Sequence, residues 1–151
     1  MLQLSALDAF MLHMEQPHTP LNGGVVMVYD RASAPGGKFG YWEVLHHFRQ
    51  RLPLVDALRL TMVNVPGSLD RPYWVEEADV DLEYRIRNTT LPPPGDWRQF
   101  CRQVSIAIER PLDMSRPPWE LEVIEGLDDG DHFPENSFAL ILKVHSSDVG
   151  R

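Results

Sequence analysis

The sequence predicts a single α/β domain over residues 1–151, in which helices flank a mixed sheet. Apolar residues recur at helical spacing in three segments, and short apolar or alternating segments lie between them. The segment 138–144 is apolar almost throughout, which is typical of a strand buried on both faces. A chain of 151 residues is long enough to bury one hydrophobic core.

The first predicted helix begins at Ser5, which forms a capping box with Asp8 three residues later. Pro17 and Pro20 end this helix. Its apolar residues recur at helical spacing, and we expect them to pack in the core: Leu7, Phe10, Met11 and Met14.

The next segments predict a strand at 25–29, a loop at 31–40 and a helix that Pro53 stops. A strand at 59–65, a turn at 66–68 and an extended segment at 73–75 follow. Apolar and charged residues then alternate from Val80 to Arg87. This pattern predicts a half-exposed strand whose charged face, including Arg85, is solvated and holds no site.

The last third begins with the rigid connector 91–95, after which Asp96 and Gln99 form the capping box of a third helix. Cys101 lies on its apolar stripe and is interpreted as a small buried hydrophobe. A strand around 121–126, a solvated acidic loop at 128–131 and the apolar strand 138–144 complete the chain. Since the last strand is the most apolar, we expect it near the centre of the sheet.

Composition excludes several classes of protein. The net charge of −8 argues against nucleic-acid binding and against adsorption to anionic lipid. One cysteine excludes an internal disulfide and a cysteine-based zinc cluster. The N-terminus does not resemble a signal peptide, and no segment reaches the roughly 18 apolar residues of a membrane span. We therefore expect a cytoplasmic protein without a transmembrane segment.

Metal and nucleotide motifs are also absent from the sequence. His46 and His47 are adjacent on a predicted helix and point about 100° apart, so they cannot easily share one metal ion. The acidic loop lacks the spaced ligands of a calcium-binding loop. Neither a P-loop, a dinucleotide fingerprint, a nucleophile elbow nor a zinc-protease helix is present. We expect no metal and no bound cofactor.

His145 is the candidate for chemistry, because it ends the buried strand 138–144. An imidazole has a pKa near neutral pH and can act as a general base. A histidine at a strand end is more often structural, so the residues upstream decide between the two interpretations.

Several segments resemble bacterial wax ester synthase/diacylglycerol acyltransferases. They are 4–10, Glu15 with Pro17, Gly23-Gly24, 71–75 and the connector 91–95. The most specific is 110–120, Arg-Pro-Leu-Asp-Met-Ser-Arg-Pro-Pro-Trp-Glu, in which Pro118 stands where the family usually has leucine. These matches follow the family's order along nearly the whole chain.

The resemblance implies a fold like that of chloramphenicol acetyltransferase, with two similar halves and a tunnel between them. The chain would be the N-terminal half, and the C-terminal half would be absent. The implied activity is transfer of an acyl group from acyl-CoA, as co-substrate, to a long-chain alcohol or diacylglycerol. The resemblance also implies that the protein could bind at the surface of a membrane or lipid droplet. It further implies that the chain could form homo-oligomers or bind a partner that supplies the second half.

The family's active-site motif is His-His-x-x-x-Asp-Gly at a strand end, and its second histidine takes the proton from the acceptor hydroxyl. If His145 is that second histidine, Gly150 matches the motif glycine, while Val144 and Val149 replace the first histidine and the aspartate. If His145 is the first, Ser146 replaces the catalyst. We prefer the first register, in which Asp148 could give weak support one position early. A third alternative is a gene truncated or altered near its end.

Three functions follow from this comparison. The first is an O-acyltransferase with His145 as general base, although we expect half of a tunnel to be inactive alone, because positioning supplies much of the rate. The second is a non-catalytic half-domain that binds a partner through exposed apolar surface. The third, a relative of condensation domains, is less favoured because of the segment 111–120.

Overall fold

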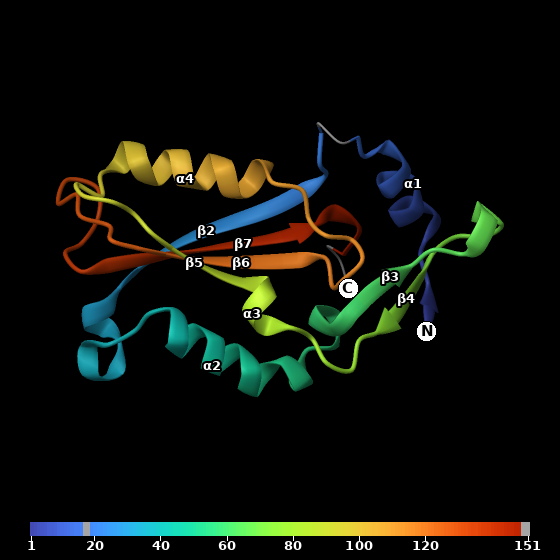
Figure 1. Cartoon of the computed structure of the whole chain (residues 1–151), viewed down its shortest axis with the longest axis horizontal. Helices are drawn as coiled ribbons and strands as arrows, with labels where there is room; N and C mark the ends of the chain where they lie inside the picture. The colour runs from blue at the N-terminus through green and yellow to red at the C-terminus, as the bar shows by residue number, and fades with distance from the viewer. Residues whose placement is uncertain (17–18, 149–151) are drawn as a thin grey trace.

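The computed structural model describes residues 1–16 and 19–148 as two sheets with helices against them (Figure 1). One sheet has the strand order β2-β7-β6-β5, and the other has the order β1-β4-β3. The strands are β1 (Leu2–Gln3), β2 (Asn22–Asp30), β3 (Leu60–Val63), β4 (Tyr73–Glu76), β5 (Ile86–Thr90), β6 (Trp119–Glu125) and β7 (Ser137–His145). The helices are α1 (Ala6–Met14), α2 (Tyr41–Arg51), α3 (Leu82–Arg85) and α4 (Trp97–Glu109).

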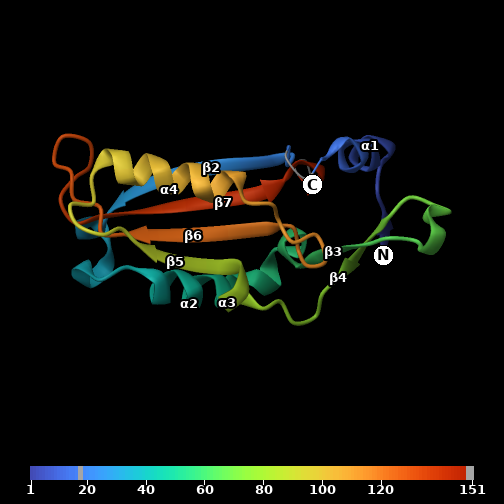
Figure 2. The same ribbon diagram turned by 45° about the horizontal axis from the view of Figure 1, so that its top comes forward.

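The predicted apolar strand is β7, and its interior position in the larger sheet is confirmed. It pairs antiparallel with β2 on one side and with β6 on the other. The parallel pair β5–β6 completes this sheet, whose mixed strand directions confirm the predicted class. Figure 2 shows the larger sheet beside the smaller one, which lies near the N-terminus together with α1.

Helices α2 and α4 cover opposite faces of the larger sheet. Val44 and Leu45 of α2 pack in one core cluster with Phe138. Phe100 and Ala107 of α4 pack in the other with Ala139 and Ile141. Alternate residues of β7 therefore enter different cores, as the period of two in a strand requires. The even-numbered positions 138–144 face α2, and the odd-numbered positions face α4.

Two helix starts follow their predicted capping residues. Ser5 accepts a hydrogen bond from the backbone of Asp8 at 3.1 Å, and Asp96 accepts one from Gln99 at 2.9 Å. The Gln99 side chain in turn accepts from the backbone of Asp96, so the capping box of α4 is complete. These local bonds use donors that the first helical turn leaves unpaired.

The prediction that the apolar stripe of α1 packs in the core is wrong. No residue of α1 is buried, and Leu7, Phe10 and Met14 are 65%, 58% and 58% exposed. The helix lies beyond the end of the larger sheet (Figure 1), where neither core cluster reaches it. Helical periodicity identifies an apolar face but does not show what covers that face.

The predicted strand over residues 80–87 is also wrong. Asp81 accepts a hydrogen bond from the backbone of Tyr84 and caps the one-turn helix α3, and β5 begins only at Ile86. Arg85, predicted on the solvated face, is 1% exposed. The local bond from the aspartate side chain competes with the strand ladder, and alternation alone does not reveal this.

The acidic segment 128–131 connects β6 and β7, as predicted for a hairpin loop. Asp129 accepts hydrogen bonds from the backbone of Trp97 and of Asp131, so it also contacts the start of α4. Cys101 on α4 is half-buried, not fully enclosed as expected. In the part of the chain that the structure describes, no helix has the length and apolar character needed to cross a membrane.

Candidate functional site

His145 ends β7, and the backbone around it ties three segments together. Its N–H donates to the carbonyl of Pro118 at 3.0 Å, and the N–H of Ser146 donates to the carbonyl of Leu21 at 2.9 Å. Pro118 belongs to the segment 110–120, and Leu21 directly precedes β2. The structure therefore joins the end of β7 to the family-like segment 110–120 and to the residue that precedes β2.

The His145 ring is fully buried, at 0% exposure, and both of its nitrogens have partners. Nδ1 lies 2.7 Å from Oγ of Ser147 and 3.2 Å from the backbone nitrogen of the same residue. Nε2 lies 3.2 Å from Oε2 of Glu15. The ring is thus held between a hydroxyl and a carboxylate.

These contacts define the tautomer of the neutral ring. A backbone N–H can only donate, so Nδ1 of His145 accepts and the ring proton lies on Nε2. The Nε2–H group then donates to Glu15. The basic atom of the ring is Nδ1, and Oγ of Ser147 lies against it.

Glu15 is the residue that follows α1, and its two carboxylate oxygens have different partners. Oε1 accepts from the backbone N–H of Leu21 at 3.3 Å, and Oε2 accepts from His145. Glu15 is 130 positions from His145 in sequence. Only the tertiary structure brings these two groups together, although Glu15 was among the residues that resembled the family.

The other two predicted site residues are placed less fully. Asp148 ends the short 3₁₀ turn Ser146–Asp148, one residue after Ser147. Gly150 lies outside the described residues. Support of His145 by Asp148 and a turn at Gly150 both stay predictions.

A buried ionic network lies on the α4 face of the sheet, next to His145. Nζ of Lys143 donates to the carbonyls of Ala107 and Arg110 at 2.9 and 2.6 Å and lies 3.3 Å from Glu120. Arg110 reaches both Glu120 and Glu122 at 3.2 Å. Burial lowers the pKa of Lys143 below its ordinary value, and the charge of Glu120 opposes this shift. A cation at the last carbonyls of α4 also stabilises the helix dipole.

This network was not predicted from the sequence. Lys143 is the one charged residue within the apolar run 138–144, and Glu120 and Glu122 alternate with Leu121 and Val123. Both patterns were signals of a charged group on the buried face of a strand. The network gives Arg110 and Glu120 of the family-like segment a structural role that fixes α4 against β6 and β7.

Arg85 forms a second buried charged site near the start of β6. Its Nη1 donates to the carbonyl of Trp119 at 3.1 Å, and its Nη2 lies 3.8 Å from Asp113. Burial lowers the pKa of the Arg85 guanidinium from its ordinary value, while the charge of Asp113 opposes this. Arg85 thus connects α3 to the segment 110–120.

Metal-ligating side chains do not gather in the structure. Among residues 1–16 and 19–148, no group of three histidine, cysteine, aspartate or glutamate side chains could hold an ion. Nε2 of His46 lies 2.9 Å from the side-chain amide of Gln50, while His47 lines a cavity between α2 and the larger sheet.

The fold defined above is shared with two classes of solved structure. The wax ester synthase/diacylglycerol acyltransferase from Marinobacter aquaeolei superposes with a TM-score of 0.78 and 30% identity over 97% of this chain. The starter condensation domain of rhizomide synthetase superposes with a TM-score of 0.64 and 15% identity over the same share, which shows a common fold. The chain covers 35% and 34% of these two structures.

The sequence decides between the two classes. The model of the wax ester synthase/diacylglycerol acyltransferase catalytic domain matches residues 4–149. A Mycobacterium tuberculosis protein described as a probable diacylglycerol O-acyltransferase, tgs3, is 34% identical over 145 residues, 96% of this chain. The chain belongs to the wax ester synthase/diacylglycerol acyltransferase family.

The match covers only part of these relatives. The chain spans 50% of the length of tgs3. It spans 28% of a second Mycobacterium tuberculosis relative, described as a putative diacylglycerol O-acyltransferase, which is 33% identical over 147 residues. The structural comparison agrees, since about a third of the Marinobacter aquaeolei enzyme is covered.

Proposed function

We propose that the chain carries part of the reaction centre of an acyl-CoA-dependent O-acyltransferase. The acceptor is a long-chain alcohol or a diacylglycerol, and the centre lies at the β7 end. The family match over residues 4–149 supports the reaction type. The observation that carries the proposal is the ring of His145, which is held between Ser147 and Glu15 beside the family-like segment that contains Pro118.

The arrangement suits proton transfer at Nδ1 of His145. Glu15 holds Nε2–H and would stabilise the imidazolium that forms, as a carboxylate does in hydrolytic triads. Oγ of Ser147 occupies the position that an acceptor hydroxyl would take. Substrate must therefore displace this hydroxyl, because the ring is fully buried.

The proposed step is direct attack. The acceptor hydroxyl gives its proton to Nδ1 of His145, and its oxygen attacks the thioester carbonyl of acyl-CoA. The new ester C–O bond forms while the C–S bond breaks. The proton returns from the imidazolium to the leaving CoA thiolate, so no oxidant, reductant or metal is required.

The test measures release of free CoA from palmitoyl-CoA in the presence of 1-hexadecanol or dioleoylglycerol. Half of a tunnel was expected to be inactive alone, but the proposed centre lies within this chain, so the proposal requires release above the uncatalysed background. It also requires a reduction by about 10²-fold or more in His145→Ala, because general-base catalysis typically contributes that much. His13→Ala is the matched control, since His13 is an exposed histidine on α1. If the unaltered chain released CoA no faster than the uncatalysed reaction does, the proposal would be contradicted.

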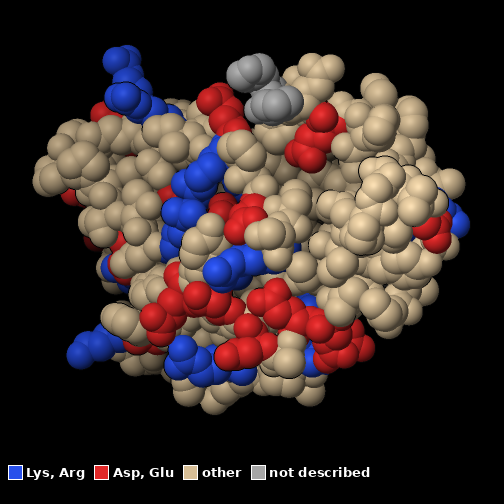
Figure 3. All heavy atoms as spheres, turned by 45° about the vertical axis from the view of Figure 1, so that its right-hand side comes forward, with Lys and Arg blue, Asp and Glu red and all other residues tan. Residues whose placement is uncertain are grey.

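A second candidate is a non-catalytic half-domain that binds a partner protein. It is favoured by the burial of His145 and by the exposed apolar side chains of α1. Figure 3 shows largely uncharged surface on that side of the molecule, next to a band of mixed charge. This candidate predicts association in size-exclusion chromatography with light scattering, and a stable monomer without CoA release would contradict both functions.

A further inference from the structure

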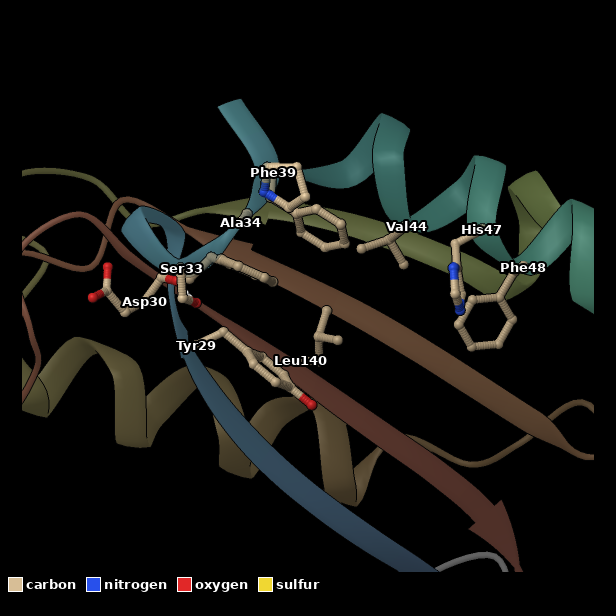
Figure 4. A pocket seen from close by; sticks show the side chains of 11 residues that line it. Tyr29, Asp30, Ser33, Ala34, Phe39, Val44, His47, Phe48 and Leu140 are labelled. Atoms are coloured by element: carbon tan, nitrogen blue, oxygen red, sulfur yellow. Dashed lines mark hydrogen bonds between the residues drawn. The ribbon is translucent and has the colours of Figure 1, made fainter. Parts of the chain in front are cut away.

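A cavity of about 430 Å³ lies between α2 and the strands β2 and β7. Its volume is within the range of small-molecule sites, about 300–1,000 Å³. Figure 4 shows Tyr29 and Leu140 rising from the sheet on one side, with Phe39, Val44 and Phe48 facing them across the cavity. The cavity is therefore elongated along α2.

The walls of this cavity are apolar and largely aromatic. The ring of Phe138 stacks on Tyr29 at 5.5 Å and packs against Phe39 at 5.3 Å. Val44 and Leu140 supply aliphatic surface between them and Phe48. Burial of apolar surface against such walls is the main source of affinity that the site can offer.

The polar groups of the lining are few, and the hydroxyl of Tyr29 among them donates to Sδ of Met27 at 3.3 Å. At one end Asp30 accepts from the backbone of Ala32 at 2.8 Å, and Ser33 donates to the carbonyl of Asp30 at 2.7 Å, so both are already engaged in their own turn. At the other end lies the exposed His47, whose ring can bond to a hydroxyl or carbonyl.

The charge of the lining restricts the ligand further. No lysine or arginine is among the described residues that line the cavity, so nothing there would compensate a phosphate. A headgroup with phosphates must stay outside, and a bare hydrocarbon chain is the part that fits.

We propose that this cavity binds one unbranched alkyl chain, with a hydroxyl or carbonyl head near His47. The inference rests on the proposed function only in the class of ligand, because long-chain alcohols and acyl chains are the proposed substrates, and the cavity is a second site away from the reacting atoms. Phe138 and Leu140 occupy even-numbered positions of β7, on the α2 face. His145 occupies an odd-numbered position, which by the period of two in a strand belongs to the α4 face with Ala139 and Ile141. The site is therefore separate from the surroundings of the His145 ring.

The binding test uses cis-parinaric acid as a fluorescent probe, titrated into the unaltered chain and displaced by 1-alkanols. We expect the affinity of the competing alkanol to rise about fourfold with each added methylene, because each methylene buried in the cavity adds that factor to the binding constant. The rise should stop at the chain length that fills the cavity. No probe binding, or displacement that does not depend on chain length, would overturn the proposal.

Two substitutions in one loop separate this site from general hydrophobic adsorption. Ala34 lines the cavity, whereas Ala32 is exposed nearby and does not line it. Ala34→Trp should fill the cavity and weaken binding at least tenfold, and Ala32→Trp should leave it unchanged. Equal affinity in the two variants would overturn the proposal. If Ala34→Trp does not fold, Ala34→Phe is the smaller substitution for the same comparison.

Two further measurements ask which substrate supplies the bound alkyl chain and whether binding in the cavity requires the proposed catalytic residue. Displacement by 1-hexadecanol and not by palmitoyl-CoA would assign the cavity to the acceptor, and the reverse result would assign it to the donor. His145→Ala should bind the probe normally. Binding without CoA release would support this site while contradicting the proposed catalysis, and CoA release without binding would overturn this site alone.

Discussion

Glu15 and His145 show how a single side-chain pair connects two ends of the chain. The carboxylate joins the end of α1 to the start of β2 and, through His145, to the end of β7. Residues remote in the sequence thereby hold the candidate reaction centre. The carboxylate accepts the proton of Nε2, while the backbone N–H of Ser147 donates to Nδ1, so Nδ1 is the basic atom.

Replacement of this carboxylate by an amide tests its role. Glu15→Gln preserves size and can still accept from Nε2 of His145, but the hydrogen bond loses its charge. We expect the free energy of unfolding to fall by about 1 kcal/mol, the typical difference between charged and neutral hydrogen bonds. Urea denaturation measures this, and Glu135→Gln is the control, since Glu135 is exposed in the β6–β7 connection.

Activity gives this substitution a second readout. If Glu15 orients the ring for catalysis, CoA release should fall more in Glu15→Gln than the loss of stability explains, with kcat more affected than KM. Equal behaviour of the Glu15 and Glu135 variants in both measurements would refute the assigned role.

At the scale of elements, the connector 91–95 is fixed by its contact with the β6–β7 connection. The backbone N–H of Leu91 donates to Glu125 at 2.9 Å, and that of Asp128 donates to Gly95 at 3.0 Å. Gly95 has φ +71°, and a Cβ there would lie 2.0 Å from the carbonyl oxygen of Gly126. The two segments approach closely because this position has no side chain.

Gly95→Ala should therefore destabilise the fold by about 2–3 kcal/mol, from the positive φ and the clash with backbone that cannot move aside. Thermal unfolding followed by circular dichroism measures the loss. The matched control is Gly130→Ala in the connection between β6 and β7, where an added Cβ meets nothing within 4 Å. A Gly95→Ala variant as stable as Gly130→Ala would show that the close approach does not matter.

The elements also show the limits of sequence patterns. The capping residues Ser5 and Asp96 located two helices because their bonds are local. The alternation from Val80 to Arg87 failed because Asp81 caps a short helix, which turns Arg85 into the interior. The alternation of apolar and charged residues in a sequence is the same whether the backbone is extended or turns into a short helix.

At the scale of the whole molecule, stability should depend on acid pH through carboxylates with lowered pKa. Hydrogen bonds from Ser115 hold the pKa of Asp113 below its ordinary value of 3.8, and the charges of Arg85 and Arg116 act in the same direction. A lowered pKa in the folded state means that the unfolded state binds more protons at acid pH. The stabilisation is present above pH 3.8 and is lost as the pH falls through the lowered value.

Ser115→Ala should remove part of this dependence. We expect the free energy of unfolding to fall less steeply below pH 3.8 in the variant than in the unaltered chain, measured by urea denaturation across the acid range. Ser105→Ala is the control, because Ser105 donates to a backbone carbonyl and not to a carboxylate. Parallel curves for the two variants would contradict this assignment.

The sequence by itself determined the class of fold, the family and the central strand. The run 138–144 indicated a buried strand, because a strand that is buried on both faces has an almost continuous apolar sequence. The segment 110–120 indicated the family. Only the tertiary structure decided that Glu15 and Ser147 hold the ring of His145, that Lys143 pairs with Glu120, and that α1 exposes its apolar face. Such contacts depend on distances between residues remote in the chain, and periodicity reports only which face of an element is apolar.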